Sequence, residues 1–439
     1  MSALAASSLS PALERYRSAF EARARADDAV GILQRQALEE FLSTGFPTQR
    51  QEEWKYTTLR RLESRSFALA RDVGSMTTVG ADRLILGLGQ RYAFVNGLAS
   101  AALSSNDPQP PGLTVLTLGQ WLARSPAAVA DFLSTHAGGS QPFERLNTAF
   151  LEDGLVVDIS EGARVDQPVY FVHRWSDGAR SVMSHPRIVV RAGRNSHCTL
   201  IEHYVGSGDG ECFTNTVAVI QLAEGASLTH YRLQEESGRD FHIGTTHVRV
   251  GRDSRYAAHS AAFGGSLGRE STTVLLESPG ANVTLRGLFA PATSQHIDIH
   301  TRIEHIAPHT MSDEEYRGIA SGRGRGVFNG KVVVRPDAQK IDARQSSRNL
   351  LLSPTAEIDT RPELEIYAND VKCSHGATTG QLDATALFYL RSRGLSIEAA
   401  RAALIQAFAS SILSHLAFAP LRDHVERILS GRFSTGVSP

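Results

Sequence analysis

The sequence has 439 residues, of which 41% are hydrophobic, so it is long enough to build two or three structural regions with sizeable cores. Its 45 basic and 46 acidic residues give a formal net charge of -1, which removes any general electrostatic case for binding nucleic acid or a membrane surface. The three cysteines, Cys198, Cys212 and Cys373, have unrelated spacings, which argues against a disulfide framework or a zinc ribbon. No apolar run approaches the length of a membrane span, and we expect a soluble, cytoplasmic protein.

Residues 1–150 predict an N-terminal helical and mixed domain. The stretch 11–43 is rich in Ala, Leu, Glu and Arg, with apolar residues at helical spacing, which indicates one or two surface helices. In the segment 45–62, Trp54 and Tyr56 alternate as on a strand and form either an amphipathic anchor or a surface for a partner. The rest of the region predicts short strands and an exposed Pro-rich loop, with no catalytic motif.

From Gly154 the pattern changes to one short strand after another, each ending in a turn. The turns recur at steps of 31, 32, 26, 29, 28, 28 and 33 residues. Similar but unequal steps without helices predict a mostly β core that spans residues 151–380. They favour a β-solenoid rather than a β-sandwich, whose turns also recur. The aligned turn residues are Gly162, Gly193, Gly225, Gly251, Gly280, Pro308, Pro336 and Asn369.

Residues 381–439 predict a C-terminal helical domain. Ser396 is a suitable N-cap for a helix, and Pro420 ends it. Such a helical region at the end of a solenoid either caps the open edge or docks a partner. The expected apolar stripe of the helix is Ile397, Leu404, Phe408, Ile412 and Leu416, and a second short stripe is Leu421, Val425 and Ile428.

Cys373 and His375 stand where a strand pattern gives way to a helical one. Alternate side chains of an extended backbone share a face, so these two point the same way. A thiolate beside an imidazole is a soft half-site for iron or zinc, each of which needs about four donors. The missing donors must then come from elsewhere; the alternative is a buried cysteine beside a hydrogen-bonded histidine.

His296, Asp298 and His300 also alternate along a predicted strand and share one face. Three ligand-type side chains on one face are able to hold a divalent metal, and they are the weaker candidates for a metal site. The alternative is the solvated outer face of a solenoid coil.

The glycine-rich run at residues 321–331 is not a phosphate-binding loop. Arg325 occupies the position of the first glycine of a Walker loop, and Val332 follows Lys331 where Ser or Thr is required. No GxSxG elbow is present to supply a hydrolytic nucleophile. We therefore expect no nucleotide hydrolysis by this chain.

Residues 316–394, which include VKCSHGAT and LFYLRSRG, closely resemble the C-terminal part of the SufB/SufD family of the SUF iron-sulfur cluster assembly system. Gly376 follows His375, where the SufB branch typically carries Glu, so the chain looks more like the SufD branch. The match is densest over residues 290–410. The strand-rich stretch from about residue 155 and the QEEWKYT segment agree with the family in outline.

This resemblance implies a right-handed parallel β-helix flanked by helical regions. It also implies a non-catalytic scaffold subunit that pairs with a SufB-like paralogue through the β-helix and binds a SufC-like ABC-type ATPase, which hydrolyses ATP, through the C-terminal helices. Cys373 and His375 match the family residues at the interface with SufB, where a transient iron-sulfur cluster forms. A reduced flavin is linked to the assembled complex, although this sequence contains no flavin motif.

Two further expectations come from the residues themselves. The last coil of a solenoid leaves unpaired backbone groups, so we expect a homodimer of the isolated chain. If each repeat is one coil, six steps of about 4.8 Å separate Cys198 from Cys373, so they do not share a cluster. The alternative function is a self-sufficient metal-dependent enzyme that uses the face of His296, Asp298 and His300.

Overall fold

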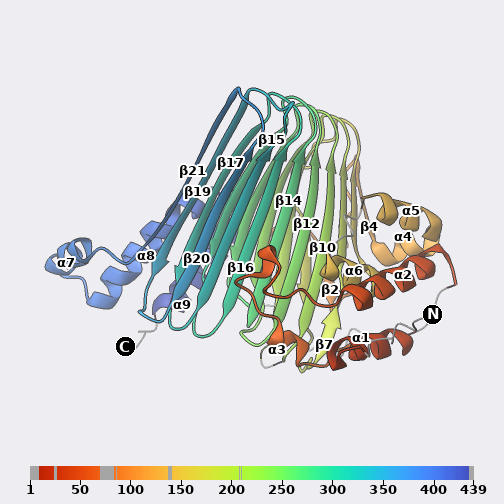
Figure 1. Cartoon of the computed structure of the whole chain (residues 1–439), viewed down its shortest axis with the longest axis horizontal. Helices are drawn as coiled ribbons and strands as arrows, with labels where there is room; N and C mark the ends of the chain where they lie inside the picture. The colour runs from red at the N-terminus through yellow and green to blue at the C-terminus, as the bar shows by residue number, and fades with distance from the viewer. Residues whose placement is uncertain are drawn as a thin grey trace, which may run out of the picture.

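The computed structural model describes residues 9–23, 27–69, 84–85, 87–136, 141–206, 208 and 210–434. Two long, mainly parallel sheets face each other and form a β-solenoid, with helices at both ends of the chain (Figure 1). The chain alternates between the two sheets, and each coil adds one strand to each sheet. The predicted β-solenoid flanked by helices is therefore confirmed.

Sheet A contains the first strand of each coil, and its neighbours pair in parallel from β5 to β20. One antiparallel strand, β4, closes its N-terminal end by pairing with β5, and the short β7 pairs with β10 and with β1. The strands are β1 (Ala68–Leu69), β4 (Leu113–Thr117), β5 (Gly154–Ile159), β7 (Val182–Ser184), β8 (Arg187–Ala192), β10 (Phe213–Leu222), β12 (Phe241–Val250), β14 (Leu267–Leu276), β16 (His296–His305), β18 (Arg325–Val334) and β20 (Glu357–Ile366).

Sheet B contains the second strand of each coil and runs in parallel from β2 to β21. The antiparallel β3 closes its N-terminal end. The strands are β2 (Gln90–Val95), β3 (Leu98–Ala99), β6 (Val169–Arg174), β9 (His197–Val205), β11 (Ser227–Glu235), β13 (Arg255–Ala262), β15 (Asn282–Phe289), β17 (Met311–Ala320), β19 (Ile341–Leu351) and β21 (Val371–Gly380).

All eight aligned turn residues lie at the same structural position, in the turn that leads from a sheet A strand to the next sheet B strand. Gly225 shows why several of them are glycine. Its φ is 68°, a left-handed conformation that glycine adopts at little cost. The unequal steps arise because the turns and the returning loops differ in length, while the strands keep their register.

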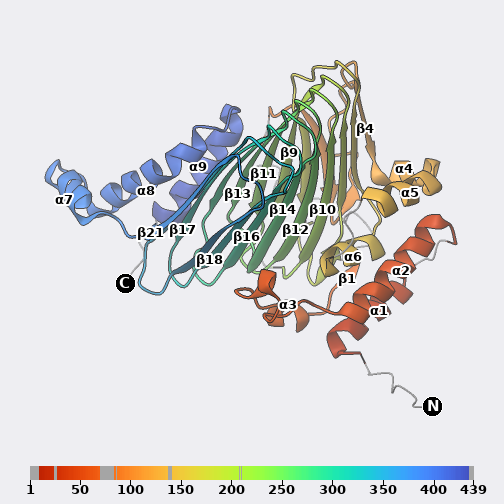
Figure 2. The same ribbon diagram turned by 45° about the horizontal axis from the view of Figure 1, so that its top comes forward.

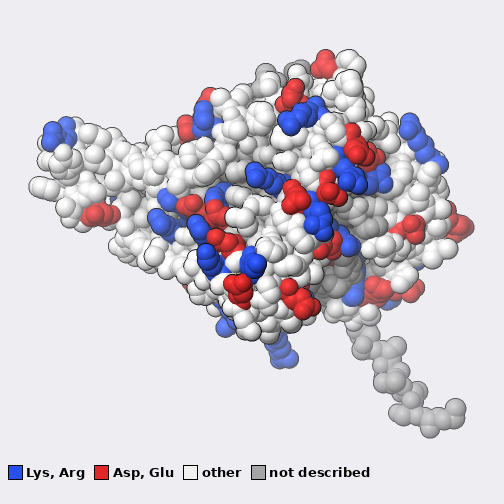
Figure 3. Space-filling view, turned by 90° about the horizontal axis from the view of Figure 1, so that it is seen from above, with Lys and Arg blue, Asp and Glu red and all other residues white. Residues whose placement is uncertain are grey.

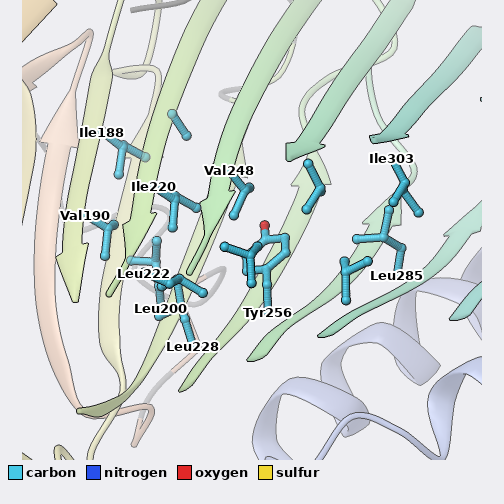
Figure 4. Close-up of a cluster of buried hydrophobic side chains, with 14 of the residues drawn as sticks. Ile188, Val190, Leu200, Ile220, Leu222, Leu228, Val248, Tyr256, Leu285 and Ile303 are labelled. Atoms are coloured by element: carbon cyan, nitrogen blue, oxygen red, sulfur yellow. The ribbon is translucent and has the colours of Figure 1, made fainter. Parts of the chain in front are cut away.

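The main core fills the space between the two sheets. Inward-facing aliphatic side chains of successive coils, such as Val190, Ile220 and Val248, stack along the solenoid, and Leu228 and Tyr256 face them from sheet B (Figure 4). Each such side chain, when fully buried, contributes on the order of 1.5–3 kcal/mol. Because every coil repeats the pattern, the core is continuous from the first coil to the last.

The N-terminal helices cover the outer face of sheet A (Figure 2). Aromatic side chains of the helices, including Phe41 and Phe143, pack with Phe213 and Phe241 of sheet A. The elements of this region are α1 (Pro11–Glu21), α2 (Ala29–Thr44), the short 3-10 helix η1 (Glu52–Trp54), α3 (Arg60–Glu63), α4 (Leu118–Arg124), α5 (Pro126–His136) and α6 (Pro142–Ala149).

The C-terminal helices α8 (Ile397–Leu413) and α9 (Ala419–Ser434) cover the outer face of sheet B, whereas α7 (Ala384–Ser392) projects away from the solenoid (Figures 1 and 2). The predicted stripe on α8 was partly wrong. Ile412 and Leu416 are buried as expected, but Ile397 is exposed, and the buried face passes through Ile405 and Ala409. The helix is apolar on several sides, so spacing alone did not identify the face that packs on the sheet.

Basic and acidic side chains are interspersed over the face seen in Figure 3, in agreement with the near-zero net charge. Ion pairs form ladders between neighbouring coils, such as Arg191 with Asp158 and Arg249 with Glu277. Among the residues that the structure describes, no helix is both long and apolar enough to cross a membrane.

His305 supplies a test of the buried polar groups in the solenoid. Its ring nitrogens lie 2.7 Å from Thr310 Oγ1 and 3.0 Å from Ser312 Oγ, and burial lowers its pKa to about 4. The unfolded chain takes up this proton near pH 6.5, so the stabilisation is complete above that pH and is lost as the pH falls toward 4. As the pH falls from about 6 to 4.5, the free energy of unfolding of the wild type should decrease more steeply than that of His305→Gln. We expect the two slopes to differ by about 1.4 kcal/mol per pH unit. Urea titrations of both proteins across this range measure it, and parallel curves would contradict it.

Candidate functional site

The two ends of the solenoid differ. The N-terminal end is closed by the antiparallel strands β3 and β4. At the other end, β20 and β21 pair on one side only among the described residues, so each presents a free edge (Figure 1). Unpaired strand edges are sites where another strand adds to a sheet. The last coil is therefore the open surface of this fold.

Cys373 and His375 lie on β21, in this last coil. Cys373 pairs in register with Ala343 and His375 with Gln345, and both of these β19 residues are buried. Cys373 packs against the interior core, so this face of β21 is the one that faces the inside of the solenoid. Because no further coil covers it, Cys373 is only half-buried and His375 is exposed.

No polar contact occupies the side chains of Cys373 and His375 within the part of the chain that the structure describes, so both are available to bind a ligand. Neither the Cys373 nor the His375 side chain has a hydrogen-bond or ion-pair partner among the described residues. Burial and the nearby Asp342 carboxylate raise the pKa of the Cys373 thiol. The thiol therefore keeps its proton at neutral pH, and a metal ion would have to displace that proton to bind. The arrangement offers two neighbouring soft donors and no more.

The other two cysteines lie far from this edge. Cys198 pairs in register with Leu228, and the same line continues through β13, β15, β17 and β19 to Cys373, six pairings away. At about 4.8 Å per pairing this is roughly 29 Å, as the repeat predicted. Cys212 is buried beside the start of β10, and burial raises the pKa of both thiols to about 12. Neither is able to share a cluster with Cys373.

His296, Asp298 and His300 lie on the outer face of β16, but this face is not solvated. The Asp298 carboxylate forms an ion pair with Arg269, accepts a hydrogen bond from Thr57 at 2.5 Å and lies 2.9 Å from His300 Nε2. The expectation of a solvated coil face was therefore wrong, because the 52–57 segment covers the strand. A metal ion at this position would have to displace the Arg269 guanidinium from Asp298.

The segment that covers β16 contains Trp54, for which the sequence left an anchor and a partner surface as alternatives. Trp54 is buried, and its ring centroid lies 3.9 Å from the Arg269 guanidinium carbon. Such a cation–π contact fixes the guanidinium beside Asp298. Trp54 is thus an internal anchor, and Tyr56 beside it is half-buried.

One cluster of ligand-type residues was missed by the sequence reasoning. His203, Glu235 and His424 bring two imidazoles and a carboxylate together, with one ligand atom of each within 4.8 Å of the others. His203 lies on the solenoid strand β9 and His424 on the C-terminal helix α9. In the sequence, 189 residues separate His424 from Glu235. No local spacing signals such a contact, because it forms only when α9 docks on sheet B.

Comparison with known proteins identifies the family. The description "SUF system FeS cluster assembly, SufBD core domain" matches residues 173–408, and "SufBD protein N-terminal region" matches residues 16–171. The chain belongs to the SufBD family. An iron-sulfur cluster assembly SufBD family protein of Synechocystis sp. is 34% identical over 418 residues, which is 92% of each chain. The iron-sulfur cluster assembly protein SufD of Escherichia coli is 31% identical over 430 residues, covering 97% of this chain and 98% of that one.

The family assignment confirms the resemblance read from residues 316–394, and the chain is SufD-like. Both matched regions together span most of the sequence, so the N-terminal helices belong to the SufBD family as well as the solenoid.

Proposed function

We propose that this SufBD-family chain is a non-catalytic, cytosolic scaffold subunit whose open solenoid end pairs with a SufB-like paralogue. The observation that carries the proposal is the last coil, where free edges of β20 and β21 coincide with inward-facing Cys373 and His375. A similar edge on a paralogue would continue both sheets and cover the exposed interior face. Without the paralogue, a second copy of this chain would take its place as a homodimer.

A nascent iron-sulfur cluster at this junction would take Cys373 and His375 from this chain and its remaining donors from the partner. Each iron of a cluster needs cysteine or histidine donors in addition to the bridging sulfides. Two neighbouring donors on one strand are insufficient by themselves. The cluster is the cargo of the complex, and a reduced flavin, if it takes part, would bind to the assembled complex.

The edge pairing is tested by two adjacent proline substitutions in β21, Ala377→Pro and Thr378→Pro. Adjacent residues of a strand direct their N–H groups to opposite sides, so one proline removes a bond to β19 and the other removes a free edge donor. We expect the variant whose proline removes the free edge donor to unfold thermally almost as the wild-type monomer does. The same variant should lose both homodimerisation and capture of the paralogue. Light scattering and a pull-down measure these results; full pairing by both variants would refute edge pairing.

The projecting helix α7 is the proposed docking surface for a SufC-like ATPase. Phe388 and Tyr389 are 73% and 56% exposed, which is unusual for large aromatic side chains, and neither is needed to cover the solenoid. Figure 3 shows few charged side chains on this projecting part. An exposed aromatic pair on a protruding helix is typical of the anchors of a protein interface.

We expect the double variant Phe388→Ala and Tyr389→Ala to weaken ATPase binding by roughly 100-fold, because each buried aromatic anchor contributes on the order of 1.5 kcal/mol or more. Point variants are preferable to deleting residues 395–439, since α8 and α9 cover sheet B. Ile32→Ala is the matched control, because Ile32 is 58% exposed on α2 at the other end of the molecule. Binding measured by calorimetry that is equal for the double variant and the wild type would exclude α7.

A further inference from the structure

A buried cluster of two histidines and a glutamate lies where the C-terminal helix α9 meets the solenoid. His203 comes from β9, Glu235 from the end of β11 and His424 from α9. Glu235 Oε1 is shared between the two rings, at 2.5 Å from His203 Nε2 and 2.9 Å from His424 Nε2. The three ligand atoms thus converge on one point from three separate elements.

The far side of each imidazole is also held. The Tyr170 hydroxyl lies 2.7 Å from His203 Nδ1, and Arg427 Nη1 donates to His424 Nδ1 at 3.1 Å. The His203 side chain is fully buried, while the Glu235 side chain is 16% exposed, so the cluster is reached from solvent on the glutamate side. The Tyr170 contact is of the kind that orients the imidazoles of metal sites, whereas the Arg427 contact holds His424 in the metal-free form.

The protonation states of the solenoid members suit a metal ion. Burial lowers the pKa of His203 and keeps it neutral. Burial opposes ionisation of Glu235, but its hydrogen bonds with His203 and His424 outweigh that effect and lower its pKa. A neutral imidazole and an ionised carboxylate are the forms that coordinate divalent ions.

We propose that His203, Glu235 and His424 form a binding site for one divalent first-row transition-metal ion, of the zinc or ferrous iron class, that fastens α9 to sheet B. Two imidazoles and one carboxylate are the protein ligands of open zinc and non-haem iron sites, where water or another ligand takes the remaining positions. The site is separate from Cys373 and His375, and it goes beyond the scaffold function proposed above.

Loading the site requires small local changes. Tetrahedral ligand atoms about 2 Å from one ion lie roughly 3.3 Å apart, so the Glu235 carboxylate must withdraw slightly from both rings. In addition, the proton of each imidazole must move from Nε2 to Nδ1, where the Tyr170 hydroxyl accepts it from His203, and Arg427 must turn away from His424. Arg427 is exposed and free to do so, and Arg427→Ala is therefore expected to tighten metal binding.

The test uses the full chain freed of metal with a chelator and titrated with Co²⁺, Zn²⁺ or, under anaerobic conditions, Fe²⁺. We expect one equivalent of Co²⁺ to bind with the visible absorption of a low-coordinate site, and Zn²⁺ and Fe²⁺ to displace it. Glu235→Gln and His424→Ala should each weaken binding by about 100-fold or more, because one of three protein donors is lost. Tyr170→Phe, which keeps the ring and removes only the hydroxyl, should weaken it by about 10–100-fold.

Two controls keep the proposal falsifiable. His375→Ala should leave the affinity unchanged, which separates this site from the solenoid end. Thermal unfolding in chelator should match between wild type and His424→Ala to within a few degrees, so a loss of binding is not a loss of folding. Unchanged Co²⁺ spectra in both Glu235→Gln and His424→Ala, loss of binding only in His375→Ala, or no binding at micromolar metal would overturn the proposal and leave the cluster as a hydrogen-bonded contact.

Discussion

Under the proposed scaffold function, replacing His375 with Ala is expected to reduce the iron and acid-labile sulfide of the complex reconstituted with SufB-like and SufC-like partners to roughly a tenth of the wild-type amount, because the proposed cluster loses one of its donors. His375 is exposed in the last coil, so the substitution removes no internal contact and the chain should fold normally. The complex should still assemble, because strand-edge pairing uses backbone groups. Iron and sulfide analysis of gel-filtered complexes measures the result.

The three cysteines provide matched controls for this experiment. Cys373→Ala should have an effect equal to or smaller than that of His375→Ala, since Cys373 is already half-buried against the core. Cys198→Ala and Cys212→Ala should change cluster yield very little, because both thiols are buried far from the open edge. A wild-type cluster content in an intact His375→Ala complex would refute the proposed role of His375 as a ligand.

The solenoid was predictable because its sequence signal repeats. Each coil places a turn residue such as Gly225 or Gly280 after an inward-facing apolar strand, and eight repetitions make the pattern clear despite unequal spacing. The direction of Cys373 and His375 was predictable for a similar reason, since alternation along a strand is a local property. Their position at an open end followed from the absence of another repeat after β21.

Contacts between distant segments were not predictable from spacing. Thr57 bonds to Asp298 across 241 residues of sequence, and His424 reaches Glu235 across 189. Both depend on which helix or loop packs on which outer sheet face, and outer faces carry a weaker pattern than the repeated interior. The buried face of α8 was not predictable either, because most sides of this helix are apolar and spacing alone does not show which side packs on the sheet.

Replacing Asp298 with Ala is expected to lower the free energy of unfolding by about 3–5 kcal/mol, because it leaves a buried arginine without its counter-charge. Arg269 and Asp298 are only 2% and 1% exposed. Burial alone would raise the pKa of Asp298, but Arg269 and His300 outweigh it and hold that pKa well below its usual range. The carboxylate is therefore ionised, and the ion pair fastens the 52–57 segment to β16.

The matched control is Glu357→Ala on the neighbouring part of sheet A, since Glu357 pairs with Arg325 at 3.0 Å with both side chains 51% exposed. That pair is expected to contribute at most about 1 kcal/mol. Urea unfolding of the two variants compares the buried and the exposed pair directly. Metal analysis of Asp298→Ala and of His424→Ala tests the metalloenzyme alternative. A bound ion lost from Asp298→Ala but kept in His424→Ala would favour a metal at His296, Asp298 and His300. A loss of stability in Asp298→Ala without a loss of metal assigns these residues to holding the N-terminal segment on the solenoid.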